Sequence, residues 1–188
     1  MKKTQAEIRA EQTLEAIRAR IPFVPFAAVV LGSGLGAVAE EIEKDAVIEY
    51  SEIPGFPVST VAGHAGRFVF GRVDGIPVVI MQGRVHYYEG YPMEDVVLPI
   101  RVMRLMGAEI LILTNAAGGL NREFRPGDMM MLTDQIATFM PSPLIGPNAE
   151  SFGTRFPDMS RIYDPVLQQV LRRTAGEMGI VQIGRAHV

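Results

Sequence analysis

Two short apolar runs, each ending in a loop of small residues, constrain the fold of this chain most strongly. Ala27–Leu31 runs into the loop 32–36 (GSGLG), and Ile110–Thr114 runs into the loop 115–119 (NAAGG). Short continuous apolar runs are typical of strands that are buried on both faces. Glycine at a strand exit lets main-chain N–H groups approach an anion, and a following helix N-terminus adds partial positive charge. The pattern predicts phosphate-binding exits, although either loop alone also fits an ordinary strand end.

The remaining elements alternate between helices and strands. We predict helices over 4–20, 37–44, 94–106 and 165–179, an extended segment over 47–50 and a strand over 129–132. Asp74-Gly75 separates Arg67–Val73 from Ile76–Met81 and predicts a hairpin with a type I′ turn. Residues 138–160 lack periodicity, which is typical of a functional or interface segment. The alternation predicts one α/β domain, with a central mixed β-sheet flanked by helices.

Composition and charge exclude several classes of protein. The chain has 18 Lys and Arg against 21 Asp and Glu, a net charge of −3, which argues against binding to nucleic acid or an anionic membrane. Cysteine is absent, which excludes disulfides, thiolate nucleophiles and Cys-zinc sites. Charged residues such as Glu7 and Arg9 stand where an export signal would be apolar, and no apolar run reaches the roughly 18 residues of a membrane span. We therefore expect a cytoplasmic protein.

A third segment, Gln82–Gly90, collects side chains that bind oxyanions. Arg84 can grip an oxyanion with two N–H groups, and His86 and Tyr88 follow at intervals of two. In an extended segment these three side chains share one face, with Val85 and Tyr87 on the other. The alternative is a solvated loop in which Arg84 pairs with Glu89.

The two imidazoles His64 and His86 do not form a metal motif. Neither belongs to an HExxH sequence, so we expect no bound metal. The chain also lacks the G-x-S-x-G elbow of serine hydrolases and the G-x-x-x-x-G-K-[ST] nucleotide loop. What remains is an anion site without a nucleophile of its own. Ser33, Arg84 and His86 could hold a phosphate that itself attacks, and Tyr88 suits a sugar hydroxyl.

A dinucleotide site is the rival interpretation of the glycine loop. Gly32, Gly34 and Ala37 fit G-x-G-x-x-G/A, and Glu49 or Glu52 lies near the spacing of the acidic residue that holds the ribose. The segment that carries these two glutamates is short and runs directly into a Pro/Gly loop, which is a poor βαβ context.

Four sets of residues together resemble the trimeric purine nucleoside phosphorylases. They are Leu31–Gly36, Gly63–Gly66, Gln82–Arg84 with His86–Tyr91, and Thr114–Asn121, in the order and spacing of that family. The resemblance implies a phosphorylase/hydrolase-like fold and a pentosyltransferase of purine salvage. Such an enzyme converts a purine ribo- or deoxyribonucleoside and phosphate into the base and (deoxy)ribose 1-phosphate. It uses phosphate as a co-substrate, needs no cofactor and forms a homotrimer.

The resemblance also implies a role for each matched residue. Arg84 and His86 are the expected catalytic residues. Phosphate would be bound by Ser33, His64, Arg84, His86 and the N–H of Ala116, and the nucleoside by Tyr88, Asn115, Ala117 and Gly118, with Phe156 reaching a neighbouring subunit. Methylthioadenosine phosphorylases share the fold, and a phosphate- or dinucleotide-binding module without activity is the other alternative.

The end of the chain departs from the family pattern. Residues 1–182 resemble the N-terminal part of a family member, so we expect a C-terminally truncated and inactive fragment. The family's Glu and Asn at the purine, a second phosphate-binding Ser and a His near the ribose have no counterpart here. Residues 183–188 (IGRAHV) coincide with one reading frame of a common sequencing adapter, and we expect them to be a non-native tail.

Overall fold

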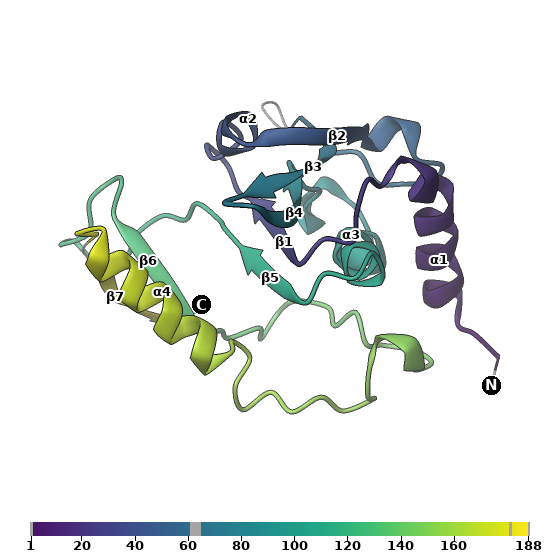
Figure 1. Ribbon diagram of the computed structural model, residues 1–188. Coiled ribbons are helices and arrows are strands. Elements are labelled where there is room, and N and C mark those ends of the chain that lie inside the picture. The colour runs from purple at the N-terminus through teal and green to yellow at the C-terminus, as the bar shows by residue number, and fades with distance from the viewer. Residues whose placement is uncertain (1, 61–64, 181, 188) are drawn as a thin grey trace. The chain divides into compact units, whose positions relative to one another are not determined.

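The computed structural model describes residues 2–60, 65–180 and 182–187, and its contacts divide the chain into two compact units (Figure 1). The first unit comprises Met1–Ala116 and Ser142–Gly153, and the second Ala117–Pro141 and Thr154–Val188. The two units are described separately below.

The first unit is built around a five-stranded sheet. Its strands are β1 (Ala27–Leu31), β2 (Glu43–Glu49), β3 (Arg67–Val73), β4 (Ile76–Gln82) and β5 (Ile110–Leu113), in the order β2-β3-β4-β1-β5. β1 pairs in parallel with both β4 and β5, whereas β3 pairs antiparallel with both β2 and β4. The prediction of a mixed sheet with helices is confirmed.

The hairpin between β3 and β4 follows from its turn residues. Asp74 and Gly75 have φ angles of 49° and 79°, and a type I′ turn requires both central residues to be left-handed. The register runs without interruption from the Val73–Ile76 pair to the Arg67–Gln82 pair. This prediction is confirmed, and the turn places the start of β3 beside the end of β4.

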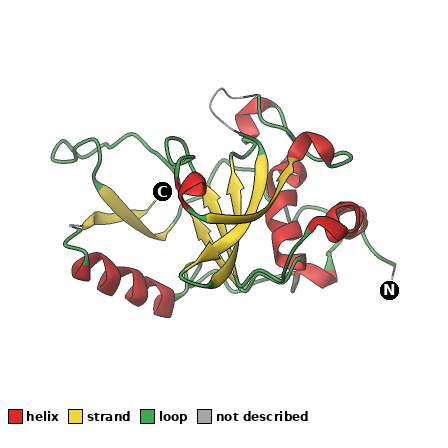
Figure 2. Ribbon diagram, turned by 45° about the horizontal axis from the view of Figure 1, so that its top comes forward, coloured by secondary structure: helices red, strands yellow, loops and turns green. Residues whose placement is uncertain are grey.

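Two helices cover one face of this sheet (Figure 2). α1 (Gln5–Ile17) begins at a capping box, in which Thr4 and Glu7 satisfy each other's backbone N–H groups, and α3 (Met93–Leu105) packs against it. Leu14 and Val102 are buried with Phe68 of β3 in one core cluster, while Val69, the next residue along β3, packs in a second cluster on the opposite face. This alternation shows that both faces of the sheet are covered.

Three local expectations are wrong in detail. The helix expected over 37–44 is α2 (Val38–Glu41), because Ile42 is extended and β2 pairs with β3 from Glu43 onward. β5 was expected to be buried, but it is the edge strand of the sheet, and Leu113 is 55% exposed. The extended segment expected over 47–50 is the end of a longer strand, β2, and Tyr50 begins a 3-10 turn.

The second unit holds α4 (Pro165–Glu177) and the parallel strands β6 (Met129–Asp134) and β7 (Gln182–His187). Asp164 caps α4 by accepting hydrogen bonds from the N–H groups of Val166 and Leu167, which confirms the predicted helix start. Residues 183–187 of the predicted non-native tail lie in β7. Along the described part of the chain, no helix has both the length and the apolar character of a membrane span.

Candidate anion site

Three strand ends meet at one edge of the first unit. β4, β1 and β5 are adjacent and parallel, so the loops that follow them leave the sheet on the same side. Ligands of open α/β sheets bind outside the carboxyl ends of the strands. The glycine loop 32–36, the segment 83–89 and Thr114–Ala116 begin at this edge, so the sheet brings the predicted motifs together.

Thr114 joins the exits of β1 and β5. Its hydroxyl donates to the carbonyl of Val30 at 2.9 Å and accepts from the N–H of Gly32 at 2.8 Å. A Cβ on Gly32 would lie 2.7 Å from the Cα of Asn115, so only glycine fits there. The sequence interpretation assigned Gly32 to anion binding, but its N–H group is bonded to Thr114, and the close approach of the two chains explains the glycine.

Arg84 joins the exits of β4 and β5. Its Nη1 donates to the carbonyl of Thr114 at 2.7 Å, and the side chain is half-buried. Partial burial lowers the pKa of Arg84, and the Coulombic interaction with Tyr88 opposes that effect. A guanidinium therefore lies where the three strand ends converge, which is the arrangement that the binding of an oxyanion needs.

Glu89 holds His86 in place. Its Oε1 accepts from the backbone N–H of His86 at 2.7 Å and lies 2.9 Å from Nδ1, while Oε2 accepts from the N–H of Thr60 at 2.7 Å. Desolvation raises the pKa of Glu89, but the hydrogen bonds from Thr60 and His86 outweigh it and bring the pKa to about 2. Because an ionised carboxylate only accepts hydrogen bonds, Nδ1 carries a proton. The alternative in which Glu89 pairs with Arg84 is wrong.

His86 and Tyr88 share a face, but not through an extended backbone. Tyr87–Glu89 forms a 3-10 turn, and the rings of His86 and Tyr88 stack with centroids 4.8 Å apart and planes at 18°. Val85 is buried, whereas Tyr87, which was expected to share its face, is 44% exposed. Tyr88 is 74% exposed, so its phenol is open to a ligand.

The other predicted residues are distributed over several parts of the chain. Ser33 is exposed in the glycine loop, and Asn115 and Ala116 are exposed after β5. Ala117, Gly118 and Phe156 belong to the second unit, where the Phe156 side chain is 86% exposed. His64 lies outside the described residues.

Sequence reasoning missed Thr114 and the role of Glu89. Thr114 was assigned to the strand, and Glu89 was considered only as a partner of Arg84. A hydroxyl at the last position of an apolar run, directly before a small-residue loop, is the signal that could have identified Thr114. Glu89 had a weaker signal, namely an acidic residue three positions after His86 and just before Gly90, where the chain is left-handed with a φ of 91°.

The geometry removes the dinucleotide alternative. α2 has four residues, and β2 pairs antiparallel with β3, so β1 does not open a parallel βαβ unit. Glu52 pairs with Arg20 at 2.7 Å, and Glu49 lies 3.7 Å from Arg67. Within the described ranges no group of three His, Cys, Asp or Glu side chains could hold a metal ion.

Comparison with known proteins agrees with this arrangement. The family model described as "Phosphorylase superfamily" matches residues 27–187. Purine nucleoside phosphorylase 1 of Geobacillus stearothermophilus is 50% identical over 170 residues (90% of this chain and 62% of the relative), and that of Bacillus subtilis is 51% identical over 172 residues (92% and 64%). A solved purine nucleoside phosphorylase in complex with ribose 1-phosphate superposes with a TM-score of 0.87 at 42% identity, covering 97% of this chain and 70% of that structure.

The chain belongs to the phosphorylase superfamily. Within that superfamily, the relatives it matches at about half identity are purine nucleoside phosphorylases. The chain spans 62% and 64% of the length of these two curated relatives.

Proposed function

We propose that the protein containing this chain catalyses the reversible phosphorolysis of purine nucleosides. The observation that carries the proposal is the meeting of Arg84, His86 and the glycine loop at the ends of the neighbouring strands β4 and β1, in a chain about 50% identical to purine nucleoside phosphorylases. The complex of one relative with ribose 1-phosphate, the expected sugar product, supports it. Because the chain spans less than two thirds of its curated relatives, the activity is proposed for the whole protein.

In this reaction phosphate is the nucleophile. Arg84 and His86 bind its oxygens and orient it, with Ser33, His64 and the N–H of Ala116 as further proposed donors. A phosphate oxygen forms a bond to the anomeric carbon of the sugar while the C–N bond breaks, and the electron pair of that bond leaves with the purine, which takes up a proton. Positive charge builds on the sugar in the transition state, and the bound phosphate dianion stabilises it.

The nucleoside is proposed to lie against Tyr88 and the segment Asn115–Gly118. The exposed Tyr88 phenol suits a ribose hydroxyl. Phe156 is proposed to complete the ribose pocket of a neighbouring subunit in a homotrimer, which light scattering of the whole protein would test. The cytoplasmic location and the absence of a cofactor remain predictions.

The test is phosphate-dependent release of hypoxanthine from inosine by the whole protein. Arg84→Ala should lower the rate about 100-fold or more, since it removes a principal donor to the reacting oxyanion. Arg20→Ala is the matched control, because Arg20 lies in an exposed ion pair with Glu52. Base release that is independent of phosphate, or no release at all, would contradict the proposal.

Two further arms address the alternatives. A module that only binds phosphate would retain phosphate in equilibrium dialysis but release no base. A methylthioadenosine phosphorylase would show a higher kcat/KM with methylthioadenosine than with inosine. The 188 residues assayed alone test the prediction that they are inactive by themselves.

A further inference from the structure

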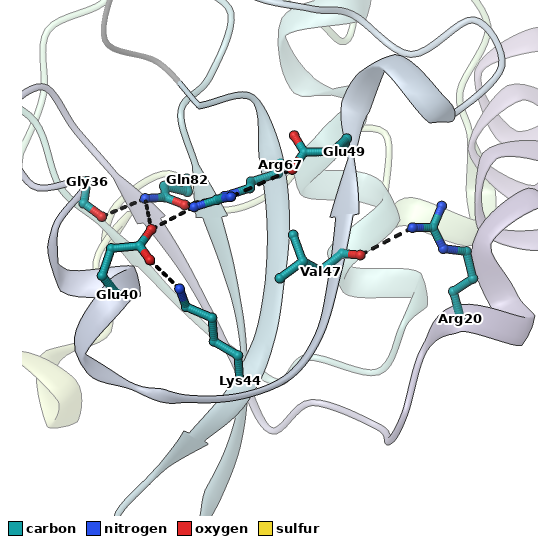
Figure 3. A network of polar contacts seen from close by, with 8 residues as sticks. All are labelled: Arg20, Gly36, Glu40, Lys44, Val47, Glu49, Arg67 and Gln82. Atoms are coloured by element: carbon teal, nitrogen blue, oxygen red, sulfur yellow. Dashed lines mark hydrogen bonds and ion pairs between the residues drawn. The ribbon is translucent and has the colours of Figure 1, made fainter.

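Gln82, the last residue of β4, has a buried side-chain amide next to the candidate anion site. Gln82 is 6% exposed, and its Nε2 donates to the carbonyl of Gly36 at 2.7 Å and to Oε1 of Glu40 at 3.1 Å (Figure 3). Its Oε1 accepts from Nε of Arg67 at 2.7 Å. Every polar atom of the amide is therefore bonded, to partners from three different segments of the chain.

The partners of Gln82 fix which way its amide points. Arg67 can only donate, so it selects the oxygen, and the Gly36 carbonyl can only accept, so it selects the nitrogen. Nη2 of Arg67 also binds Oε1 of Glu40 at 2.6 Å, which closes a ring of three side chains. Hydrogen bonds from Lys44 and Gln82 bring the pKa of Glu40 to about 2, so its carboxylate stays charged at neutral pH.

Backbone hydrogen bonds at Gln82 and Gly83 connect the end of β4 to further segments of the chain. Its carbonyl accepts from the N–H of Gly66 at 2.9 Å, and the next carbonyl, that of Gly83, accepts from the buried Tyr50 hydroxyl at 3.1 Å. Gly83 has a φ of 91°, so the chain turns sharply there before it reaches Arg84. The last residue of β4 thus contacts both the residue that closes the glycine loop and the residues that precede β3.

We propose that Gln82, oriented by Arg67 and Glu40, is a positioning residue that sets the glycine loop 32–36 at the distance from Arg84 and His86 at which one phosphate contacts both. Gln82 points away from the exit, toward Gly36, and acts through these segments. The inference rests on the proposed function, because it assumes that the anion bound there is phosphate. It adds a residue of the sheet interior to the determinants of phosphate affinity.

Gln82→Met in the whole protein is the first test. The substitution keeps the length and burial of the side chain and removes its hydrogen bonds. The Kd for radiolabelled inorganic phosphate, measured by equilibrium dialysis, should rise about tenfold, and the KM for phosphate should rise with it while the KM for inosine changes less than about twofold. A merely structural role would lower Tm and leave that ratio of KM values unchanged.

Gln82→Glu, alone and combined with Glu40→Gln, provides a second test. The new carboxylate would face the carbonyl of Gly36 and the carboxylate of Glu40, so phosphate should bind more weakly than in Gln82→Met. Gln82→Glu combined with Glu40→Gln restores one donor between these two side chains and should recover part of the affinity for phosphate. If Gln82→Met does not fold, Arg67→Lys serves instead, since lysine cannot bond Gln82 and Glu40 with the same fork.

Arg20→Gln is the matched control. Like Arg67, Arg20 braces β2, by donating to the carbonyl of Val47 at 3.2 Å, but it has no contact with Gln82 (Figure 3). It should leave both KM values unchanged. Equal shifts in the KM values for phosphate and inosine in Gln82→Met, or an unchanged Kd for phosphate, would overturn the positioning role.

The two proposals can fail separately. Phosphate dialysis needs no turnover, so a wild-type protein that binds phosphate but releases no base would refute the phosphorylase while Gln82→Met still decides the role of Gln82. A wild-type protein that binds no phosphate would overturn both.

Discussion

The exits of β4 and β5 lie on either side of the β1 exit at the same edge of the sheet, but they are built differently. After β4 the chain is fixed at successive positions, by the contacts of Gln82, by Tyr50 bonding to Gly83 and by Glu89 bonding to His86. After β5 the chain is fixed at Thr114, and Asn115 and Ala116 are exposed. Arg84 and His86, which are proposed to bind phosphate, are thus preorganised within this chain, whereas Asn115, which is proposed to face the nucleoside, lies on an exposed segment. Groups that are already held in position lose less entropy when a ligand binds and need less reorganisation during the reaction.

Among the variants that test this difference between the exits, Gly32→Ala should have the largest effect on the free energy of unfolding. A Cβ there meets the backbone of Asn115 at 2.7 Å, so the exits of β1 and β5 must separate, and we expect a loss of about 3 kcal/mol in the free energy of unfolding. Urea unfolding of the whole protein measures it. Gly118→Ala is the control, because a Cβ at that position meets nothing within 4 Å. Equal losses for both glycines would show that the contact between the exits is unimportant.

Thr114→Val should cost less, about 2 kcal/mol. It is isosteric, but it leaves the buried N–H of Gly32 without its acceptor. Thr114→Ser keeps the hydroxyl and should restore most of the stability in the same urea titration. A stable Thr114→Val protein would mean that the β5 exit is held by contacts other than this hydroxyl.

Glu89→Gln tests, through the pH dependence of the free energy of unfolding, whether Glu89 holds the segment after β4 in place. The pKa of Glu89 is lowered from 4.5 to about 2, so its contribution to stability is complete above pH 4.5 and is lost as the pH falls toward 2. The glutamine variant should lose that part of the pH dependence of unfolding. Its affinity for phosphate should fall about tenfold at neutral pH, since the charged acceptor of His86 is removed. A wild-type slope that persists in the variant would contradict the role of Glu89.

Asn115→Ala should have the smallest effect on folding. The side chain is exposed, so we expect the free energy of unfolding to change by less than about 0.5 kcal/mol. The KM for inosine should rise while the KM for phosphate stays constant. A raised KM for phosphate would contradict the assignment of the Asn115 side chain to the nucleoside.

Local chemistry explains which elements were predictable. The β3–β4 hairpin follows from Asp74-Gly75, and the start of α4 follows from Asp164-Pro165, because each signal acts over a few neighbouring residues. The start of β2 was not predictable, since Glu43 looks helical from its own neighbours and becomes a strand residue through pairing with Arg72 of β3. Tertiary pairing overrides local propensity there.

The candidate site divides in the same way. Arg84 and His86 stand in a compact motif, so their residue types alone indicate an oxyanion site. The contact of Gln82 with Gly36 spans 46 residues, and that of Thr114 with Gly32 spans 82. Such contacts depend on strand order, which a single sequence does not specify. The residues that bind were therefore predictable, and those that hold them in place were not.

The position of β5 at the edge of the sheet matters for anyone who prepares this chain. Among the described residues, no strand pairs with the outer edge of Leu111–Leu113, which is an exposed apolar strand. Such an edge is a template for pairing between molecules, and its tendency to aggregate grows with concentration. The yield of soluble 188-residue chain should therefore fall as its concentration rises.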